Sequence, residues 1–192
     1  MKAFGNINNP EILVIGCFHG DEPQGKFLIE EYLKVNQDSK LCFVPCLNSY
    51  GVQHNIRTNE NGVDLNRNFP TKNWVLGEKD AYYGGDSPAS EIQTKFIIEL
   101  IQKYPFKAIL SLHAPYKVVN YDGDGRNLAN KISEIINYPV EESIGYPTPG
   151  SFGTWAGIEQ NIPTITLELD EKIDVNELKE PVFKIFSMLE GY

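Results

Sequence analysis

The sequence predicts an α/β fold, in one domain that covers residues 1–192. Short apolar runs rich in β-branched residues alternate with longer amphipathic stretches, the order expected when helices cover a sheet. The chain has 192 residues, of which 41% are hydrophobic, and this is enough for a core without disulfide bonds. Neither a sequence repeat nor a change of composition divides it into two parts.

The first half of the chain predicts two buried strands with a helix between them. Residues 11–16 (Glu-Ile-Leu-Val-Ile-Gly) and 41–47 are the strands, and residues 24–35, introduced by Pro23, have helical periodicity. Residues 48–86 are polar, aromatic and rich in Asn and Gly. A segment this long without periodicity is usually functional or disordered, and its aromatic residues argue against disorder.

The second half continues the alternation of strands and helices. Residues 90–103 place five large apolar side chains on one helical face. The remaining expected elements are a strand at 108–112, a sheet extension at 118–121, helices at 125–137 and 152–160, a strand at 163–169 and a closing helix at 175–189.

Composition excludes some classes of partner. The net charge is −9 without any basic run, which argues against nucleic acid and anionic membrane surfaces as partners. No apolar run approaches the roughly 18–20 residues that span a bilayer. Residues 1–10 lack the apolar core of a signal peptide, so we expect a cytoplasmic protein.

The three cysteines fit the same compartment. Cys42 and Cys46 lie four residues apart on an expected strand, which separates them by roughly 13 Å. That distance is too long for a disulfide bond or for chelation of one ion. We therefore expect Cys17, Cys42 and Cys46 to be buried thiols in a reducing compartment.

Two histidines and a glutamate have the positions expected of metal ligands. His19 and Glu22 follow the first strand, and His113 follows the strand at 108–112. A zinc hydrolase usually supplies three protein ligands and leaves one coordination position open. The third histidine, His54, lies in the polar segment without a partner motif, and we expect it at the surface.

Glu168 is a carboxylate within an otherwise apolar strand. It shares one face of that strand with Thr166, while Leu167 and Leu169 share the other. Such a residue is either a solvent-facing group on an edge strand or a functional group with a raised pKa. Beside a metal it would suit a general base.

Four motifs together resemble the zinc carboxypeptidase family. They are His19-Gly-Asp-Glu22, Asp64-Leu-Asn-Arg-Asn68, Ser111-Leu-His113 and Thr166-Leu-Glu168, in the order of that family. The resemblance implies a zinc-dependent hydrolase with a compact three-layer α/β/α fold around a central mixed, twisted sheet. It implies that one zinc ion is held by His19, Glu22 and His113, and that Glu168 activates the zinc-bound water.

The same resemblance implies roles for four further residues. Asp64 corresponds to a carboxylate that orients a zinc-binding histidine. Arg57 stands nine residues before Asn66, the spacing of an arginine that stabilises the oxyanion. Asn66 and Arg67 correspond to the pair that binds the free carboxylate of a small peptide substrate.

Residues 145–155 resemble the murein peptide amidase branch of that family in bacteria. The supporting segments are 57–62 and 85–91, and the similarity extends from about Ile12 to Leu169. The resemblance implies hydrolysis of the bond between γ-D-glutamate and meso-diaminopimelate during recycling of cell-wall peptides. Tyr146 then corresponds to a mobile substrate-binding tyrosine, although a packed loop aromatic is the simpler interpretation.

The sequence departs from the family pattern in two places. Asn48-Ser-Tyr-Gly51 replaces the usual Asn-Pro-Asp-Gly, which leaves the geometry of that turn open. The chain also begins close to its first core strand, and we expect the N-terminal hairpin of larger members to be absent.

Two other functions remain as alternatives. The His-Gly-x-Glu and Asn-Arg signatures also occur in zinc N-acyl amino acid deacylases of the succinylglutamate desuccinylase and aspartoacylase type. The other alternative is a binding protein that retains zinc but has no catalytic activity, although both Glu168 and Arg57 are present.

Overall fold

A mixed sheet forms the centre of the computed structural model, which describes residues 1–142 and 145–192. Within those residues the sheet has seven strands in the order β1-β3-β2-β4-β7-β5-β6. The strands are β1 (Phe4–Gly5), β2 (Ile12–Gly16), β3 (Cys42–Val44), β4 (Ala108–His113), β5 (Val118–Asp122), β6 (Val140–Glu141) and β7 (Thr164–Glu168).

The central strands end along one edge of the sheet. Strands β3, β2, β4 and β7 run parallel, whereas β1 is antiparallel to β3 and β5 is antiparallel to β7. In the β4–β7 register His113 lies opposite Glu168. The loop that contains His19 follows β2 at the same edge, so three polar side chains from distant parts of the sequence meet there.

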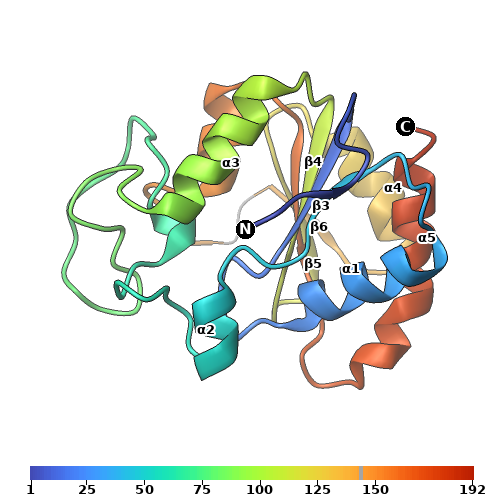
Figure 1. Ribbon diagram of the computed structural model, residues 1–192, viewed down its shortest axis with the longest axis horizontal. Coiled ribbons are helices and arrows are strands. Elements are labelled where there is room, and N and C mark those ends of the chain that lie inside the picture. The colour runs from blue at the N-terminus through green and yellow to red at the C-terminus, as the bar shows by residue number, and fades with distance from the viewer. Residues whose placement is uncertain (143–144) are drawn as a thin grey trace.

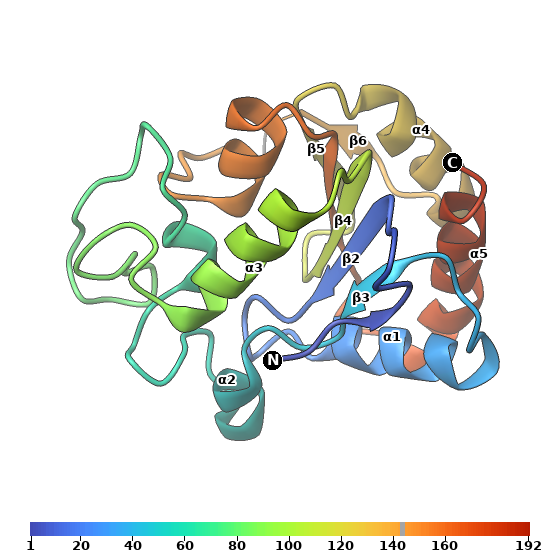
Figure 2. The same ribbon diagram turned by 45° about the horizontal axis from the view of Figure 1, so that its top comes forward.

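Helices cover both faces of the sheet, as Figures 1 and 2 show. Helices α1 (Gln24–Val35), α4 (Arg126–Ile136) and α5 (Lys179–Leu189) lie on one face. Helix α3 (Ile92–Lys103) and the π-helical turn η2 (Thr154–Glu159) lie on the other. The predicted three-layer α/β/α fold is confirmed, and no helix in the described ranges is long and apolar enough to cross a membrane.

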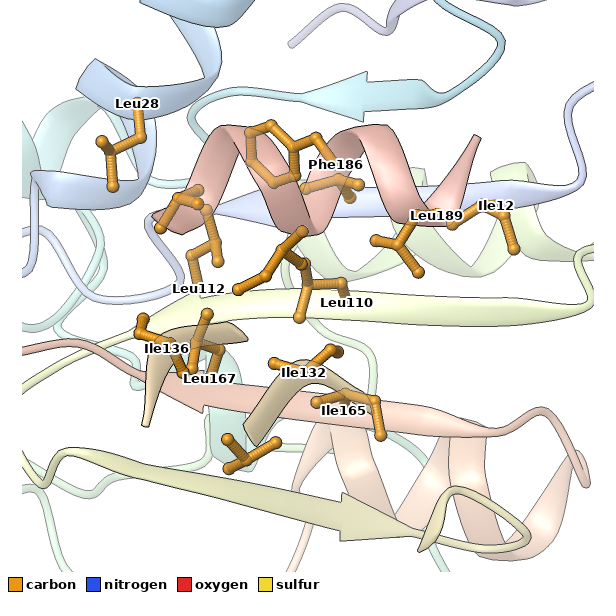
Figure 3. Packing of buried hydrophobic residues seen from close by; sticks show 14 of the residues in the cluster. Ile12, Leu28, Leu110, Leu112, Ile132, Ile136, Ile165, Leu167, Phe186 and Leu189 are labelled. Atoms are coloured by element: carbon orange, nitrogen blue, oxygen red, sulfur yellow. The ribbon is translucent and has the colours of Figure 1, made fainter. Parts of the chain in front are cut away.

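Each face of the sheet has its own hydrophobic core, because successive strand residues point to opposite faces. In β2, Ile12 and Val14 pack toward α1 and α5, while Leu13 and Ile15 pack toward α3 and η2. Figure 3 shows the first core, where Leu110 and Leu112 of β4 meet Ile132, Ile136 and Phe186 from the helices.

The observed elements differ from the predicted ones mainly where they are short. Helix α2 (Ser49–His54) and the 3₁₀ turn η1 (Leu65–Arg67) lie in the segment that sequence patterns left irregular. Strands β1 and β6 have two residues each, too few for a periodic signal. The closing helix begins as a separate 3₁₀ turn, η3 (Val175–Leu178), and the predicted strand at 41–47 is limited to β3.

The cysteines are free thiols. Cys17 and Cys42 are buried as expected. Cys46 is half-buried, which corrects the expectation, because β3 ends at Val44 and Cys46 lies in the loop beyond it.

Replacing Leu110 with Ala tests the first core. The side chain is 1% exposed, and its removal leaves a cavity between β4 and the helices, so we expect the free energy of unfolding to fall by about 3 kcal/mol. Urea titration followed by circular dichroism measures this. Val35→Ala is the control, because Val35 is 72% exposed and its truncation should change stability by less than about 0.5 kcal/mol. Equal effects of the two changes would contradict this packing.

Candidate active site and metal centre

A cleft of about 380 Å³ lies where β2, β4 and β7 end. Its volume falls within the range of small-molecule sites. Eight of the nine site residues expected from the sequence line it, and the ninth, Asp64, is fully buried behind it. The eight are His19, Glu22, Arg57, Asn66, Arg67, His113, Tyr146 and Glu168.

His19, Glu22 and His113 are grouped as ligands of one metal ion would be. The Glu22 carboxylate lies between the two rings, with Oε1 2.8 Å from His19 Nδ1 and Oε2 3.0 Å from His113 Nδ1. Their candidate ligand atoms all lie within 4.8 Å of one another. Tetrahedral zinc separates neighbouring ligand atoms by about 3.3 Å, so small movements suffice to hold the ion.

Asp64 connects the metal group to the rest of the cleft. Its Oδ1 lies 3.0 Å from His19 Nε2 and accepts a hydrogen bond from the backbone N–H of Asn66. Its Oδ2 accepts two hydrogen bonds from Arg57, through Nε at 3.0 Å and Nη2 at 2.9 Å. With a metal at Nδ1, the contact with Asp64 would keep the proton of the neutral His19 ring on Nε2.

The charges at Asp64 and His19 depend on each other. Burial alone would raise the pKa of Asp64, but His19 and Arg57 hold it well below its usual range. Burial alone would lower the pKa of His19, whereas the carboxylates of Asp64 and Glu22 raise it to about 9. Two carboxylates thus converge on one ring and attract a positive charge, which a divalent cation would supply.

The loop after β2 is held in place by close backbone packing against α2. A Cβ atom on Gly20 would lie 2.0 Å from the carbonyl carbon of Gly51, so only glycine fits there. Asn48 caps α2 by accepting from the Gly51 N–H, and its Nδ2 donates to the carbonyls of Phe18 and Arg57.

The departure from the family motif therefore leaves the turn intact. The two changed residues, Ser49 and Tyr50, are exposed, whereas Asn48 and Gly51 make the contacts. His54, at the end of α2, is exposed as predicted, and its ring lies against that of Tyr50 with 4.1 Å between ring centroids.

Packing and strand position orient the second histidine. The His113 ring stacks on Phe18 with 5.3 Å between ring centroids and 15° between the ring planes. The backbone N–H of the next residue, Ala114, donates to Glu22 Oε2 at 3.2 Å. Both contacts keep His113 Nδ1 directed at Glu22.

Glu168 lies at the end of an interior strand and is 6% exposed. This excludes the alternative of a solvent-facing residue on an edge strand, because β7 lies between β4 and β5. Its Oε2 is buried and finds no hydrogen-bond partner among residues 1–142 and 145–192. Burial raises the pKa of Glu168, while the nearby His113 and the backbone amide of Tyr116 oppose the shift.

Two arginines and an asparagine line another wall of the cleft. The Arg57 guanidinium approaches the metal group, with Nη1 3.7 Å from Glu22 Oε1. Arg67 is buried, and its Nη1 donates to the backbone carbonyl of Asn66. The Asn66 side chain accepts from the backbone N–H of Phe152 through Oδ1.

The segment that contains Tyr146 packs directly on the Asp64–Asn68 motif. The backbone N–H of Phe69 donates to the Gly150 carbonyl at 2.9 Å. Gly150 has φ +72°, and a Cβ there would lie 2.1 Å from the Arg67 carbonyl oxygen. Tyr146 itself is 42% exposed at the border of the cleft, so it is not the packed loop aromatic of the simpler interpretation.

Sequence reasoning missed several residues that line the cleft, among them Tyr82, Asn120 and Asp122. The Tyr82 ring lies against both arginines, 5.0 Å from Arg57 Cζ and 5.9 Å from Arg67 Cζ. Asn120 and Asp122 belong to β5, which the sequence indicated only as an extension of the sheet. Polar residues at alternate positions of this strand were the available signal.

The family follows from comparison with known proteins. The model for the family described as zinc carboxypeptidase matches residues 3–143. The chain belongs to the zinc carboxypeptidase family, and it is a hydrolase of the peptidase or amidase class. Zinc is the metal of that family, and the group of His19, Glu22 and His113 fits it.

Several proteins similar to this chain are murein peptide amidases. Murein peptide amidase A of Escherichia coli K12 is 33% identical over 170 residues, which cover 81% of this chain and 69% of the relative. Murein peptide amidase A of Vibrio campbellii is 32% identical, and the match covers 84% of this chain and 70% of that relative. The crystal structure of murein-tripeptide amidase MpaA from E. coli O157 superposes with a TM-score of 0.86 at 30% identity, covering 99% of this chain and 86% of that one.

Replacing Asp64 with Ala tests its position between the metal group and Arg57. Removing this carboxylate leaves Arg57 without its two hydrogen bonds to Asp64 and His19 without its orienting group. We expect the metal-free protein to lose about 3 kcal/mol of unfolding free energy and zinc affinity to fall roughly 10- to 100-fold. Urea titration and competition with a zinc-sensitive dye measure the two effects. Asp38→Ala, at an exposed position, is the control, and unchanged zinc affinity in the Asp64 variant would contradict this role.

Proposed function

We propose that this chain is a zinc-dependent amidase that hydrolyses the γ-D-glutamyl-diaminopimelate bond of murein peptides. The observation that carries the proposal is that the buried Glu168 carboxylate, whose Oε2 has no hydrogen-bond partner among the described residues, shares one cleft with the group of His19, Glu22 and His113. The similarity to murein peptide amidase A supports the substrate. Residues 1–192 then act as one zinc peptidase domain, in the cytoplasm during recycling of murein peptides.

His19, Glu22 and His113 would hold the ion through the two Nδ1 atoms and the carboxylate. When bound, zinc acidifies a water molecule and polarises the scissile carbonyl. Asp64 keeps the His19 ring in the required orientation through its Nε2.

Glu168 acts as the proton carrier of the reaction. It removes a proton from the attacking water while the new C–O bond forms, and it passes a proton to the amine as the C–N bond breaks. Its burial favours the neutral acid, which brings its pKa closer to the working pH and makes it a stronger base.

Arg57, Asn66 and Arg67 supply the interactions with substrate. Arg57 is held by Asp64 beside the metal group, where its charge stabilises the oxyanion that develops on the carbonyl oxygen. Arg67 and Asn66 bind the free carboxylate on the amine side of the bond. Tyr146, at the exposed border, covers the bound peptide.

Replacing Glu168 with Gln removes the proton carrier but keeps the shape of the side chain. We expect kcat on murein tripeptide to fall roughly 1,000-fold, the scale of general acid–base catalysis. Metal analysis should still find one zinc ion per chain. Glu177→Gln is the matched control, because Glu177 is exposed on η3. Retained turnover in the Glu168 variant would exclude this mechanism.

Replacing Arg67 with Ala tests recognition of the carboxylate. On a substrate with a free carboxylate we expect kcat/KM to fall roughly 100-fold, because one charged hydrogen-bond partner is lost. On the same peptide with that carboxylate amidated, the loss should be much smaller. Steady-state kinetics on the two peptides decides this, and equal losses would place Arg67 outside the substrate contact.

A substrate panel separates the proposal from its alternatives. Murein tripeptide, simple peptides and N-acyl amino acids are assayed with the zinc-loaded protein. Turnover of the acylated amino acid alone would establish the deacylase. Stoichiometric zinc and tight peptide binding without any hydrolysis would establish the binding protein.

A further inference from the structure

Two of the three cysteines lie next to each other where β2 and β3 end, beside the loop that carries two metal ligands. The parallel register pairs Ile15 with Val44, and the same offset two residues later places Cys17 opposite Cys46. The two segments stay together beyond the strands, since the backbone N–H of Asn48 donates to the Cys17 carbonyl at 2.9 Å. Neighbouring strands lie about 4.8 Å apart, within the Cα separation of about 4.4–6.8 Å that a disulfide bond spans.

The Cys17 thiol has one proton and two acceptors beside it. Its Sγ lies 3.5 Å from the carbonyl oxygen of Glu22, and the Cys46 sulfur is the other acceptor. Hydrogen bonds from Cys17 and from Ser49 lower the pKa of the Cys46 thiol, although burial opposes the shift. The charge of Lys26 acts in the same direction as the hydrogen bonds. Cys46 is therefore favoured as a thiolate, which is the form that reacts with oxidants.

The two sulfurs differ in their access to solvent. Cys46 is half-buried and borders an open depression of about 750 Å³, which Lys26 and Pro45 also line. Cys17 is buried, with no exposed surface. An accessible, acidic thiol with a second thiol next to it is the arrangement of cysteine redox sensors. The third cysteine, Cys42, lacks both properties, because it is fully buried and burial raises its pKa to about 12.

The backbone at Cys17 is unfavourable for a residue that only fills space. Its φ is +53°, in the left-handed region where glycine or asparagine is favoured and a larger side chain is strained. Glycine would avoid that cost, so the thiol is kept at a position that does not suit its backbone. Its contacts with Cys46 and Glu22 are what the side chain adds there.

We propose that Cys17 and Cys46 form a reversible disulfide bond when the protein meets a hydroperoxide, and that this bond weakens zinc binding by His19 and Glu22. The Cys46 thiolate attacks one peroxide oxygen and the O–O bond breaks, which leaves a sulfenic acid and a hydroxide that takes up a proton. The Cys17 sulfur then attacks the Cys46 sulfur, and water leaves with the thiol proton as the S–O bond breaks. The peroxide gains the two electrons that the two thiols lose.

The position of Cys17 links this bond to the metal group. Cys17 is the first residue after β2 and lies two residues before His19. In the disulfide its sulfur has no proton, so the Glu22 carbonyl loses its donor and the loop is held less firmly. We expect zinc affinity to fall roughly 10-fold, as when a group that supports a metal ligand is removed. Coupling is reciprocal, so bound zinc must in turn favour the two thiols over the disulfide.

Mass spectrometry of the wild-type protein tests the bond directly. The protein is treated with one equivalent of hydrogen peroxide, digested and mapped, with and without a phosphine reductant. We expect the loss of two hydrogen atoms and a reducible peptide pair that joins Cys17 to Cys46. Oxidation of Cys46 to a sulfinic acid without that link, or a bond between two copies of the chain, would overturn the inference.

Competition with a zinc-sensitive dye measures the effect on the metal site. Peroxide should weaken zinc binding by the wild type, and the phosphine should restore it. In Cys46→Ser peroxide should have no effect, and the affinity should equal that of the reduced wild type. Cys42→Ala is the matched control, because it removes a thiol but keeps the pair, and it should respond as the wild type does. An unchanged affinity in the oxidised wild type, or an equal loss in Cys46→Ser, would contradict the proposal.

A redox titration checks the same coupling from the other side. A tenfold preference of zinc for the reduced protein corresponds to about 30 mV in the midpoint of a two-electron couple. Saturating zinc should therefore make the midpoint more positive by that amount, and equal midpoints with and without zinc would exclude the coupling. These measurements do not involve hydrolysis. A protein that cleaves murein tripeptide without forming this disulfide keeps the proposed function and overturns the inference, and a disulfide-forming protein without amidase activity does the reverse.

Discussion

The site depends on one buried carboxylate. Asp64 contacts His19, Arg57 and the backbone of Asn66, which come from three segments separated in the sequence. A fully buried charge is stable only when its partners are all in place, so these segments are coupled energetically. The metal-ligand loop, the arginine beside it and the turn that contains Arg67 consequently adopt their positions together. A change in any one of them reaches the other two through Asp64.

The parts of the fold that the sequence predicted correctly are those with a long, regular pattern. Strands β2 and β4 are buried on both faces and mainly apolar, β7 alternates apolar with polar residues, and α1, α3 and α4 each complete about three turns. Short elements lack such a pattern: α2 is defined by an asparagine cap, and β1 and β6 by their neighbours in the sheet. The type of helix at η2 likewise depends on tertiary packing, since Gly153 and Gly157 accommodate Asp122 there.

The residues of the candidate site also fall into two groups, those that a sequence motif identifies and those that only the folded structure identifies. Residues within short motifs, such as His19 and Glu22, could be named from the sequence, and the resemblance to a family added Asp64 and Arg57. Tyr82 could not be named from the sequence, because the contact that distinguishes it is with two arginines from other segments. Asp122 could not be named either, since it reaches the cleft only through the pairing of β5 with β7.

Strand β5 runs opposite to β7, and this direction decides how far from Glu168 each residue of β5 reaches the cleft. Its first residue, Val118, lies opposite Glu168, whereas its last, Asp122, lies opposite Thr164, four residues farther along β7. Inward-facing positions therefore follow one another at intervals of about 7 Å, starting from the reaction centre. A substitution at position 120 or 122 would therefore change the cleft at a different distance from Glu168, because Asn120 lies opposite Thr166 and Asp122 opposite Thr164. Single substitutions on one strand can thus reshape the cleft in discrete steps away from Glu168, while the loop that carries His19 and Glu22 stays unchanged.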